Sequence, residues 1–175
     1  MKVPDGLRKA VRTIPDFPKP GILFKDITPI LGDAALLAAS VALLSEPFAG
    51  KGITKVVAIE SRGFILGPSL ALRLGAGFVP IRKKGRLPCE TLSVGYGLEY
   101  GTDAIEMHKD AIGFGERVLI HDDVIATGGT AAACCDLVNR AGARVEGFSF
   151  LMELASLKGR AALCEHVPFH AVMAD

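Results

Sequence analysis

The most constraining feature of the sequence is the stretch Arg117–Thr130, which reads RVLIHDDVIATGGT. Its apolar run Val118–Ile120 is bounded by charged residues, as is typical of a strand buried in a parallel sheet. Two adjacent acids, Asp122 and Asp123, follow at the carboxyl end of this strand. Because open α/β sheets bind ligands at that edge, the stretch predicts an α/β fold with a ligand site after this strand.

The run that follows the acids predicts a cradle for a phosphate group. Gly128 and Gly129 let the backbone turn tightly and bring its amides close to an anion, and Thr127 and Thr130 add hydroxyl groups. We expect a helix to begin near Thr130, so that its amino-terminal dipole also points at the anion. The acids beside the cradle would accept hydrogen bonds from hydroxyl groups or bind a hard metal ion. This is the pattern needed to hold a sugar phosphate.

Each half of the pattern also has a simpler explanation. Paired acids after a buried strand occur as bare magnesium sites, and a Thr-Gly-Gly-Thr turn alone is more often a tight connection between a strand and a helix. Their direct succession in this sequence favours the combined site. The chain contains no Walker-type GxxxxGK[ST] loop and no GxGxxG run after a strand, which disfavours nucleotide folds of those two kinds.

Val118–Thr130 resembles the phosphoribosyl-pyrophosphate (PRPP) motif of the type I phosphoribosyltransferases, in which a hydrophobic strand, two acids and a TGGT-like loop follow one another. The resemblance implies that Asp122 and Asp123 bind the 2′ and 3′ hydroxyls of the ribose. It also implies that the 5′-phosphate binds to Ala126, Thr127, Gly128, Gly129 and Thr130. His121 stands where we expect an aliphatic residue, and we interpret it as a strand-end histidine without a role in the chemistry.

A proline-rich segment near the amino terminus carries a second resemblance. Asp16–Thr28 has two prolines and a glycine around aromatic residues, which makes it too rigid and too apolar for a linker. A packed strap is the alternative to a binding loop. Its FPKPGILFKDIT run resembles the base-binding segment of the adenine phosphoribosyltransferases. The resemblance implies that Leu23 and Lys25 meet the adenine edge through backbone groups and that Phe24 stacks on the ring. Lys25 stands where many relatives have arginine.

A further loop, Glu60–Gly63, follows the strand expected at Lys55–Ile59. Arginine beside glycine suits pyrophosphate, because a guanidinium pairs with anionic oxygens and glycine lets backbone amides approach. A helix-capping turn with a surface arginine is the alternative. The resemblance favours the first interpretation and implies that pyrophosphate binds to Ser61, Arg62 and Gly63.

Residues 82–115 lack a clean helical period. They begin with the basic run Arg82–Arg86, and Leu92–His108 alternates like a hairpin. A segment of this length is either a functional lid or a disordered tether, and basic charge beside a phosphate-binding edge favours the lid. Its RKKGRLP and LEYGTD runs resemble the flexible hood of the family.

The resemblance of the hood implies roles for three of its residues. Lys83 and Tyr100 are expected to contact the pyrophosphate, and Glu99 is expected to reach the reacting centre when the hood closes. The catalytic residues implied in this way are Glu99, Arg62 and Lys83.

The composition fits a domain that binds small molecules. A length of 175 residues, with 50% hydrophobic content and a mean hydropathy of +0.37, suits one domain whose core covers both faces of a sheet. The net charge of +1 gives no basic field for nucleic acid, and no apolar run is long enough to span a bilayer. Four cysteines without CxxC spacing, and a start without a signal-peptide pattern, predict a reduced, cytoplasmic protein in which Cys134 and Cys135 serve packing.

Strands and helices alternate along most of the chain. We expect helices at residues 3–11, 34–45 (with Asp33 as N-cap), 67–74, 130–140 and 157–165, and strands at 55–59, 77–81, 118–120, 145–152 and 169–173. This order predicts a three-layer, Rossmann-like α/β sandwich of about five parallel strands, with an antiparallel flap from the hood. We expect one phosphoribosyltransferase domain over residues 1–175, with a base-binding segment in 1–30 and the hood in 82–115.

Taken together, the resemblances imply the activity of the adenine phosphoribosyltransferases, glycosyltransferases of purine salvage that convert adenine and PRPP into AMP and pyrophosphate. They imply Mg²⁺ held mainly by substrate and waters, without direct protein ligands, and a homodimer. No nucleic acid or membrane partner is expected. Two alternatives are a PRPP sensor without chemistry and a sibling enzyme that uses xanthine, guanine or hypoxanthine.

Overall fold

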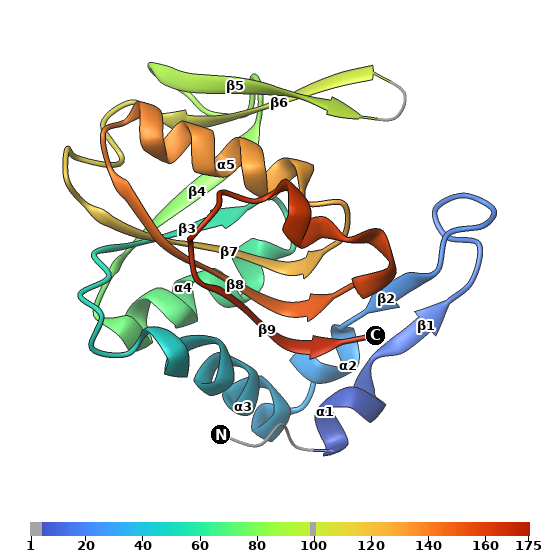
Figure 1. Ribbon diagram of the computed structural model, residues 1–175. Helices are drawn as coiled ribbons and strands as arrows, with labels where there is room; N and C mark the ends of the chain where they lie inside the picture. Colours follow the sequence, from blue (N-terminus) through green and yellow to red (C-terminus); the bar gives the residue numbers. More distant parts are fainter. Residues whose placement is uncertain (1–4, 99–100) are drawn as a thin grey trace.

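The computed structural model describes residues 5–98 and 101–175. Within them, seven strands form one sheet in the order β5-β6-β4-β3-β7-β8-β9 (Figure 1). These strands are β3 (Lys55–Ile59), β4 (Gly77–Lys83), β5 (Thr91–Leu98), β6 (Gly101–His108), β7 (Arg117–Ile125), β8 (Arg144–Glu153) and β9 (Phe169–Ala174). The α-helices are α1 (Asp5–Ala10), α2 (Thr28–Leu31), α3 (Ala34–Ser45), α4 (Gly63–Leu74) and α5 (Gly129–Arg140).

Five neighbouring strands of the sheet, from β4 to β9, run parallel, so their carboxyl ends meet at one edge. The strands β5 and β6 form an antiparallel hairpin, and β6 joins the sheet through the pairs Arg82↔Glu106 and Lys83↔Ile105 on β4. This arrangement confirms the α/β fold with a mostly parallel sheet and an antiparallel flap.

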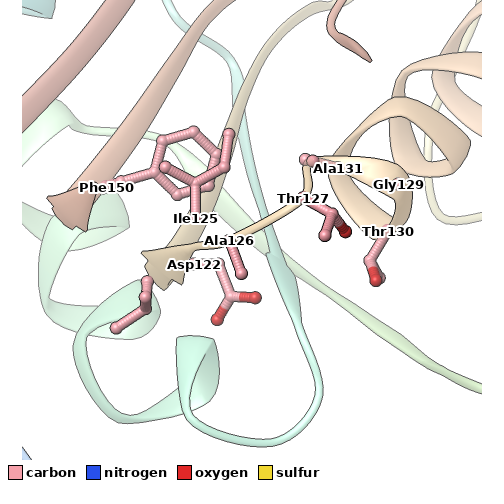
Figure 2. Close-up of a pocket in the computed structure, with 10 residues that line it drawn as sticks. Asp122, Ile125, Ala126, Thr127, Gly129, Thr130, Ala131 and Phe150 are labelled. Atoms are coloured by element: carbon pink, nitrogen blue, oxygen red, sulfur yellow. The ribbon is translucent and has the colours of Figure 1, made fainter. Parts of the chain in front are cut away.

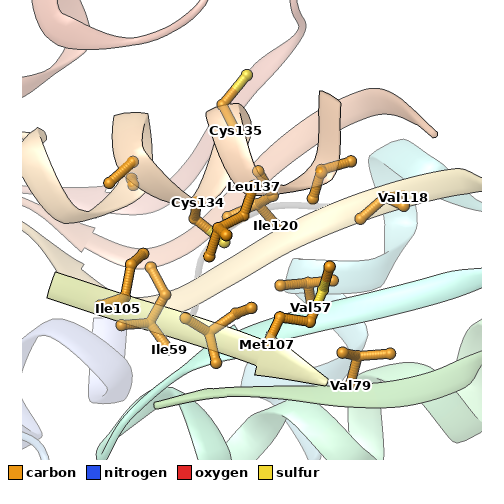
Figure 3. Packing of buried hydrophobic residues seen from close by; sticks show 14 of the residues in the cluster. Val57, Ile59, Val79, Ile105, Met107, Val118, Ile120, Cys134, Cys135 and Leu137 are labelled. Atoms are coloured by element: carbon orange, nitrogen blue, oxygen red, sulfur yellow. The ribbon is translucent and has the colours of Figure 1, made fainter. Parts of the chain in front are cut away.

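Helices cover both faces of the sheet, as Figure 1 shows. The helices α3 and α4 lie on one face, where Leu44 and Leu66 are fully buried. The helix α5 lies on the other face, between the sheet and the β5–β6 hairpin. Figure 3 shows how Ile105 and Met107 of the hairpin pack with Leu137 of α5 and the strands below. The part of the hood that packs on α5 is therefore apolar and continuous with the core.

The amino-terminal segment forms a two-stranded antiparallel ribbon beside the main sheet. Its strands are β1 (Arg12–Ile14) and β2 (Phe24–Asp26). The buried carboxylate of Asp26 holds the ribbon at its base, because it accepts hydrogen bonds from Arg12 and from the backbone and hydroxyl group of Thr28. These donors lower the pKa of Asp26, with the backbone N–H of Thr28 as the largest cause. The fixed loop expected in Asp16–Thr28 therefore lies at the tip of this ribbon, between the end of β1 and the start of β2.

Two expected helices need correction. In place of a helix at residues 157–165, the structure has two 3-10 turns, Ala155–Leu157 and Gly159–Ala162. Lys158 has a φ of 53° there, which interrupts any helix. The helix expected from residue 67 begins earlier, at Gly63, and Pro68 lies inside it. A proline favours the first turn of a helix, and this tendency placed the expected start too late.

The cysteines also differ from the expectation. Cys134 is fully buried in the core below α5, as expected of a packing residue. Cys135 and Cys164, however, form a disulfide bond across 29 positions of the sequence. A search for local CxxC spacing cannot detect such a pair, because the fold brings its members together. The expectation of four reduced cysteines is therefore wrong for this pair.

Candidate active site

The strand β7 ends at Ile125, and α5 begins four residues later at Gly129. The connection is tight because Gly128, the N-cap residue, has a φ of 81°, a left-handed conformation that favours glycine. A side chain at Gly128 would also collide with the backbone carbonyl of Gly159. The backbone after β7 is therefore held close to the first turn of α5, with the amides of that turn free to bind a ligand.

A cavity of about 110 Å³ lies at this turn. Figure 2 shows Thr127 and Thr130 at the start of α5, with the ring of Phe150 on the other side. All five residues predicted to bind the 5′-phosphate line this cavity: Ala126, Thr127, Gly128, Gly129 and Thr130. Amides at a helix amino terminus together with two hydroxyl groups form a suitable anion site.

Asp122 faces the same side of the sheet as this cavity. It lines both the phosphate cavity and a second cavity of about 200 Å³ below the hood, so it lies between the two. Its Oδ1 accepts a hydrogen bond of 2.8 Å from the backbone N–H of Asp123. Burial, and then the charge of Asp123, raise the pKa of the Asp122 carboxyl well above its usual range. A hydroxyl donor or a cation would relieve this cost.

Asp123 points to the opposite face, because neighbouring residues of a strand alternate. Its carboxylate is 2% exposed, and burial raises its pKa while the charge of Arg62 opposes the rise. The Oδ2 atom lies 3.1 Å from Nε of Arg62, but no described residue gives it a hydrogen bond of good geometry. A buried acceptor of this kind is ready for a donor such as a ribose hydroxyl.

The loop Glu60–Gly63 joins β3 to α4 at the same edge. Ser61 is exposed, and Gly63 is buried against β7, where a side chain would come within 3.0 Å of Asp122 Oδ1. Glu60 pairs with Arg82 at 3.1 Å, which lowers the pKa of the Glu60 carboxyl. Arg62 turns toward the ribbon and Asp123. Its predicted contact with pyrophosphate stays a prediction.

The three residues predicted to bind the base lie at β2. Phe24 meets Phe17 edge to face, with ring centroids 5.1 Å apart, and Leu23 beside it is 58% exposed. The side chain of Lys25 points away to Asp175, with 3.1 Å between Nζ and the carboxylate. The backbone carbonyl of Lys25 accepts a hydrogen bond of 3.2 Å from Nη1 of Arg62, and the predicted contact of its backbone with a base stays a prediction.

The hood contributes Lys83, at the end of β4. Its Nζ lies 3.0 Å from Oδ2 of Asp103 on β6, and this hydrogen bond raises the pKa of Lys83. Tyr96 on β5 is paired with Asp103 across the hairpin, and it lines the 200 Å³ cavity with Asp122 and Thr130. Glu99 and Tyr100 lie outside the described residues.

Three residues at the site were not predicted from the sequence: Tyr96, Asp103 and Gly159. Tyr96 and Asp103 lie opposite each other in the hairpin. The alternation of residues 92–108, together with the register of the two strands, could have predicted this pair. Gly159 packs against the carbonyl of Ala126, and an isolated glycine in an expected helix is a signal of close backbone approach.

Across residues 5–98 and 101–175, no three His, Cys, Asp or Glu side chains gather closely enough to hold a metal ion. In the same residues, no helix is long and apolar enough to cross a membrane.

Comparisons with known proteins agree with this geometry. The family model of the phosphoribosyl transferase domain matches residues 26–167. An adenine phosphoribosyltransferase of Synechococcus sp. (strain JA-3-3Ab) is 56% identical over 170 residues, which cover 97% of each chain. The crystal structure of an adenine phosphoribosyltransferase from Rhodothermus marinus is 62% identical, covers 98% of this chain and 97% of its own, and superimposes with a TM-score of 0.95. One from Saccharomyces cerevisiae, in complex with an imino-altritol bisphosphate and adenine, is 44% identical over 95% of this chain and 96% of its own, with a TM-score of 0.90.

Proposed function

Because the chain belongs to the phosphoribosyl transferase domain family and, within it, to the adenine phosphoribosyltransferases, we infer that it converts adenine and PRPP into AMP and pyrophosphate. The reaction is a glycosyl transfer of purine salvage. The observation that carries this inference is high identity over nearly the full length, combined with a phosphate cavity lined by all five predicted residues.

We assign the parts of PRPP to the sheet edge by charge and polarity. The 5′-phosphate would lie at the start of α5, and the ribose hydroxyls would meet Asp122 and Asp123. The pyrophosphate would extend toward Ser61–Gly63 and Lys83. Two observations support this assignment. Oδ2 of Asp123 has no hydrogen-bond donor among the described residues, and Asp122 and Lys83 line the same cavity.

In the reaction, N9 of adenine forms a bond to C1 of the ribose while the C1–O bond to pyrophosphate breaks. Pyrophosphate leaves with the electron pair, and N9 loses its proton. The site must therefore stabilise departing negative charge and keep water away from a centre of oxocarbenium character. Lys83 is suited to the first task because it carries a positive charge and lines the cavity that also contains Asp122. Glu99 is proposed to act on the proton when the hood closes over the base.

We also propose that PRPP binds as its Mg²⁺ complex. Oxygen is the ligand that Mg²⁺ prefers, and the Asp122 carboxylate opens onto both cavities. Because the described residues form no metal cluster of their own, substrate and water would supply most ligands. When bound, the ion would neutralise charge on the pyrophosphate.

A homodimer is a further proposal. Ile65 and Leu72 lie seven residues apart on α4, and their side chains are 48% and 82% exposed. An apolar pair on one helix face suits a contact with a second copy of the chain. Cytoplasmic location and a single domain over residues 1–175 stay predictions of the sequence.

An assay of AMP formation tests the function. The protein with Mg²⁺ and PRPP should turn over adenine and should reject hypoxanthine and guanine by several orders of magnitude, because a 6-oxo group would leave backbone polar groups of the ribbon unpaired once the base covers them. Equal turnover of hypoxanthine would show a sibling enzyme. PRPP binding without any turnover would instead favour a sensor.

A further inference from the structure

The 3-10 turn Gly159–Ala162 lies directly against residues 126–130, the phosphate loop. A side chain at Gly128 would collide with the carbonyl of Gly159, and a side chain at Gly159 would collide with the carbonyl of Ala126. The two backbones therefore touch, without room for a Cβ atom on either glycine. Gly128 has the left-handed conformation that closes the phosphate loop, so this contact supports the loop at the residue on which its shape depends.

Arg160 fixes the position of this turn. Its Nε donates a hydrogen bond of 2.8 Å to Oε1 of Glu153, and its Nη2 donates one of 2.7 Å to Oε2. A bidentate pair of this kind fixes the orientation of the guanidinium as well as its position. Glu153 is the last residue of β8, and only 9% of its side chain is exposed. The turn is thus attached through one side chain to a buried group of the sheet.

The guanidinium of Arg160 also lies over the ring of Phe169 on β9, with Cζ 3.9 Å from the ring centroid. Phe169 packs against Phe150 of β8, with ring centroids 5.6 Å apart. Phe150 lines the phosphate cavity opposite the start of α5, as Figure 2 shows. Arg160 therefore connects to the cavity by two routes, through the backbone of Gly159 and through this pair of rings.

We propose that Arg160 is a positioning residue for the phosphate loop. Its pair with Glu153 holds the Gly159–Ala162 turn against Gly128, so that the amides of the loop are ordered before a phosphate binds. An anion that meets a loose loop must order the backbone on binding, and this cost lowers its affinity. The inference rests on the proposed function, and it adds that part of the affinity for the 5′-phosphate comes from a side chain that acts through other residues.

The test compares the binding of AMP with that of adenosine, because the two ligands differ only in the 5′-phosphate. Calorimetric titration of each gives the ratio of the AMP affinity to the adenosine affinity. In Arg160→Met this ratio should fall by about tenfold, the effect of ordering roughly one residue of backbone on binding. The affinity for adenosine should stay at the wild-type value. Partial unfolding would lower both affinities by the same factor, so the ratio separates positioning from a general loss of stability.

Steady-state kinetics should show the same effect on KM rather than on kcat. In Arg160→Met the KM for PRPP should rise by about tenfold, while kcat stays close to the wild-type value, because uniform binding is lost. Saturating PRPP orders the phosphate loop before the ribosyl group is transferred.

Three further variants define how Arg160 acts. Arg160→Lys keeps the charge but cannot form the bidentate pair, so it should recover only part of the affinity for AMP. Glu153→Gln removes the other half of the pair, and its loss should not add to that of Arg160→Met in a double variant, because both changes break one contact. Arg140→Met is the matched control, since the side chain of Arg140 is 56% exposed, against 58% for Arg160, and pairs with Asp136 within α5. Its ratio should equal that of the wild type.

A wild-type ratio in Arg160→Met would overturn the inference, and so would losses that add up fully in the double variant. A wild type that binds AMP no better than adenosine would also overturn it. The single variants are expected to fold, because a disulfide bond from Cys164 to Cys135 of α5 holds the far end of the segment. Should Arg160→Met fail to melt cooperatively, Arg160→Lys decides alone, with a lowered ratio in support and a wild-type ratio against.

Failure of this inference differs from failure of the proposed function. A wild type that forms AMP, together with an unchanged ratio in Arg160→Met, refutes the role of Arg160 and leaves the proposed function intact. A wild type that forms no AMP refutes the proposed function, and the binding ratio still decides the role of Arg160.

Discussion

Asp122 and Asp123 are neighbours in the sequence, but they serve different sides of the sheet. Asp122 opens onto the two cavities, and Asp123 faces Arg62 and the ribbon. If each accepts a hydrogen bond from a ribose hydroxyl, replacement removes an interaction of about 1.5–3 kcal/mol. We therefore expect Asp122→Ala and Asp123→Ala each to weaken PRPP binding by about ten- to a hundredfold, measured by calorimetry.

Asp136→Ala is a suitable control for these two variants. Asp136 lies on α5 with a side chain that is 47% exposed, and it pairs with Arg140 on the same helix. Its loss should leave PRPP affinity unchanged. Unchanged affinity in both Asp122→Ala and Asp123→Ala would refute the ribose assignment.

His121 gives the fold a sensitivity to acid. It is fully buried, its Nδ1 lies 2.8 Å from the carbonyl of Ser149, and burial lowers its pKa from 6.5 to about 4. In the unfolded chain His121 binds a proton below about pH 6.5, but in the folded chain it binds one only below about pH 4. The free energy of unfolding therefore falls as pH drops through this window.

The variant His121→Ile should lose part of this acid sensitivity. Between pH 7.5 and pH 5 the wild type should lose about 2 kcal/mol more stability than the variant, since one pKa unit corresponds to about 1.4 kcal/mol. Urea unfolding of both proteins at the two pH values measures the difference. Parallel losses in the two proteins would show that His121 does not cause the sensitivity.

At the scale of residues, the sequence predicted those roles that depend on local order. The acids and the glycines of 122–130 follow one another along the chain, so their spacing alone indicates a phosphate site. The pairing of Lys83 with Asp103 and the direction of Arg62 depend on contacts between distant segments. Spacing carries no information about these.

At the scale of elements, the hood is a hairpin whose end next to α5 is apolar. This end packs on α5 through Ile105 and Met107, and Lys83 and Tyr96 face the cavity below. Glu99 lies outside the described residues, and its role rests on the family resemblance. Closure of the hood, which the family resemblance implies, would exclude water from the reacting centre.

We expect Glu99→Ala to lower the single-turnover rate of AMP formation by about 10²–10⁴, the usual contribution of general acid–base catalysis. PRPP affinity should change little. Glu90→Ala is the matched control, since Glu90 begins the same hairpin with an 82% exposed side chain paired with Lys109. A wild-type rate in Glu99→Ala would contradict the catalytic role and indicate a carboxylate that only contacts solvent.

Elements with a clear pattern were predicted well, and those shaped by neighbours were not. The helix α3 begins after Asp33, whose side chain accepts from the backbone N–H groups of Ala35 and Leu36, as its capping position predicts. The segment 155–162 instead follows the backbone of the phosphate loop, where Gly159 meets the carbonyl of Ala126. The local sequence of this segment gives no sign of the contact with Ala126.

At the scale of the whole molecule, the parallel sheet collects four separate segments at one edge. The phosphate loop, the loop after β3, the hood and the ribbon all meet where the parallel strands end. This explains why motifs more than a hundred residues apart can act on one substrate. Among the described residues, none of the proposed site residues lies at the opposite edge of the sheet.

The exposed apolar pair on α4 leads to a prediction about assembly. If α4 contacts a second copy, Leu72→Glu should place a charge in that interface and shift the protein to monomers, as measured by analytical ultracentrifugation. Phe114→Glu serves as the control, because Phe114 is 94% exposed in a loop before the amino end of β7. A wild type that sediments as a monomer would contradict the proposed dimer directly.

The central claim is that this edge holds PRPP with its 5′-phosphate at the start of α5. A crystal structure of the protein with PRPP and Mg²⁺, without adenine, tests it most directly. We predict the 5′-phosphate in the cavity lined by Ala126–Thr130, the ribose hydroxyls at Asp122 and Asp123, and the pyrophosphate toward Ser61–Gly63 and Lys83. PRPP bound with its 5′-phosphate at Ser61–Gly63, or away from this edge, would contradict the account.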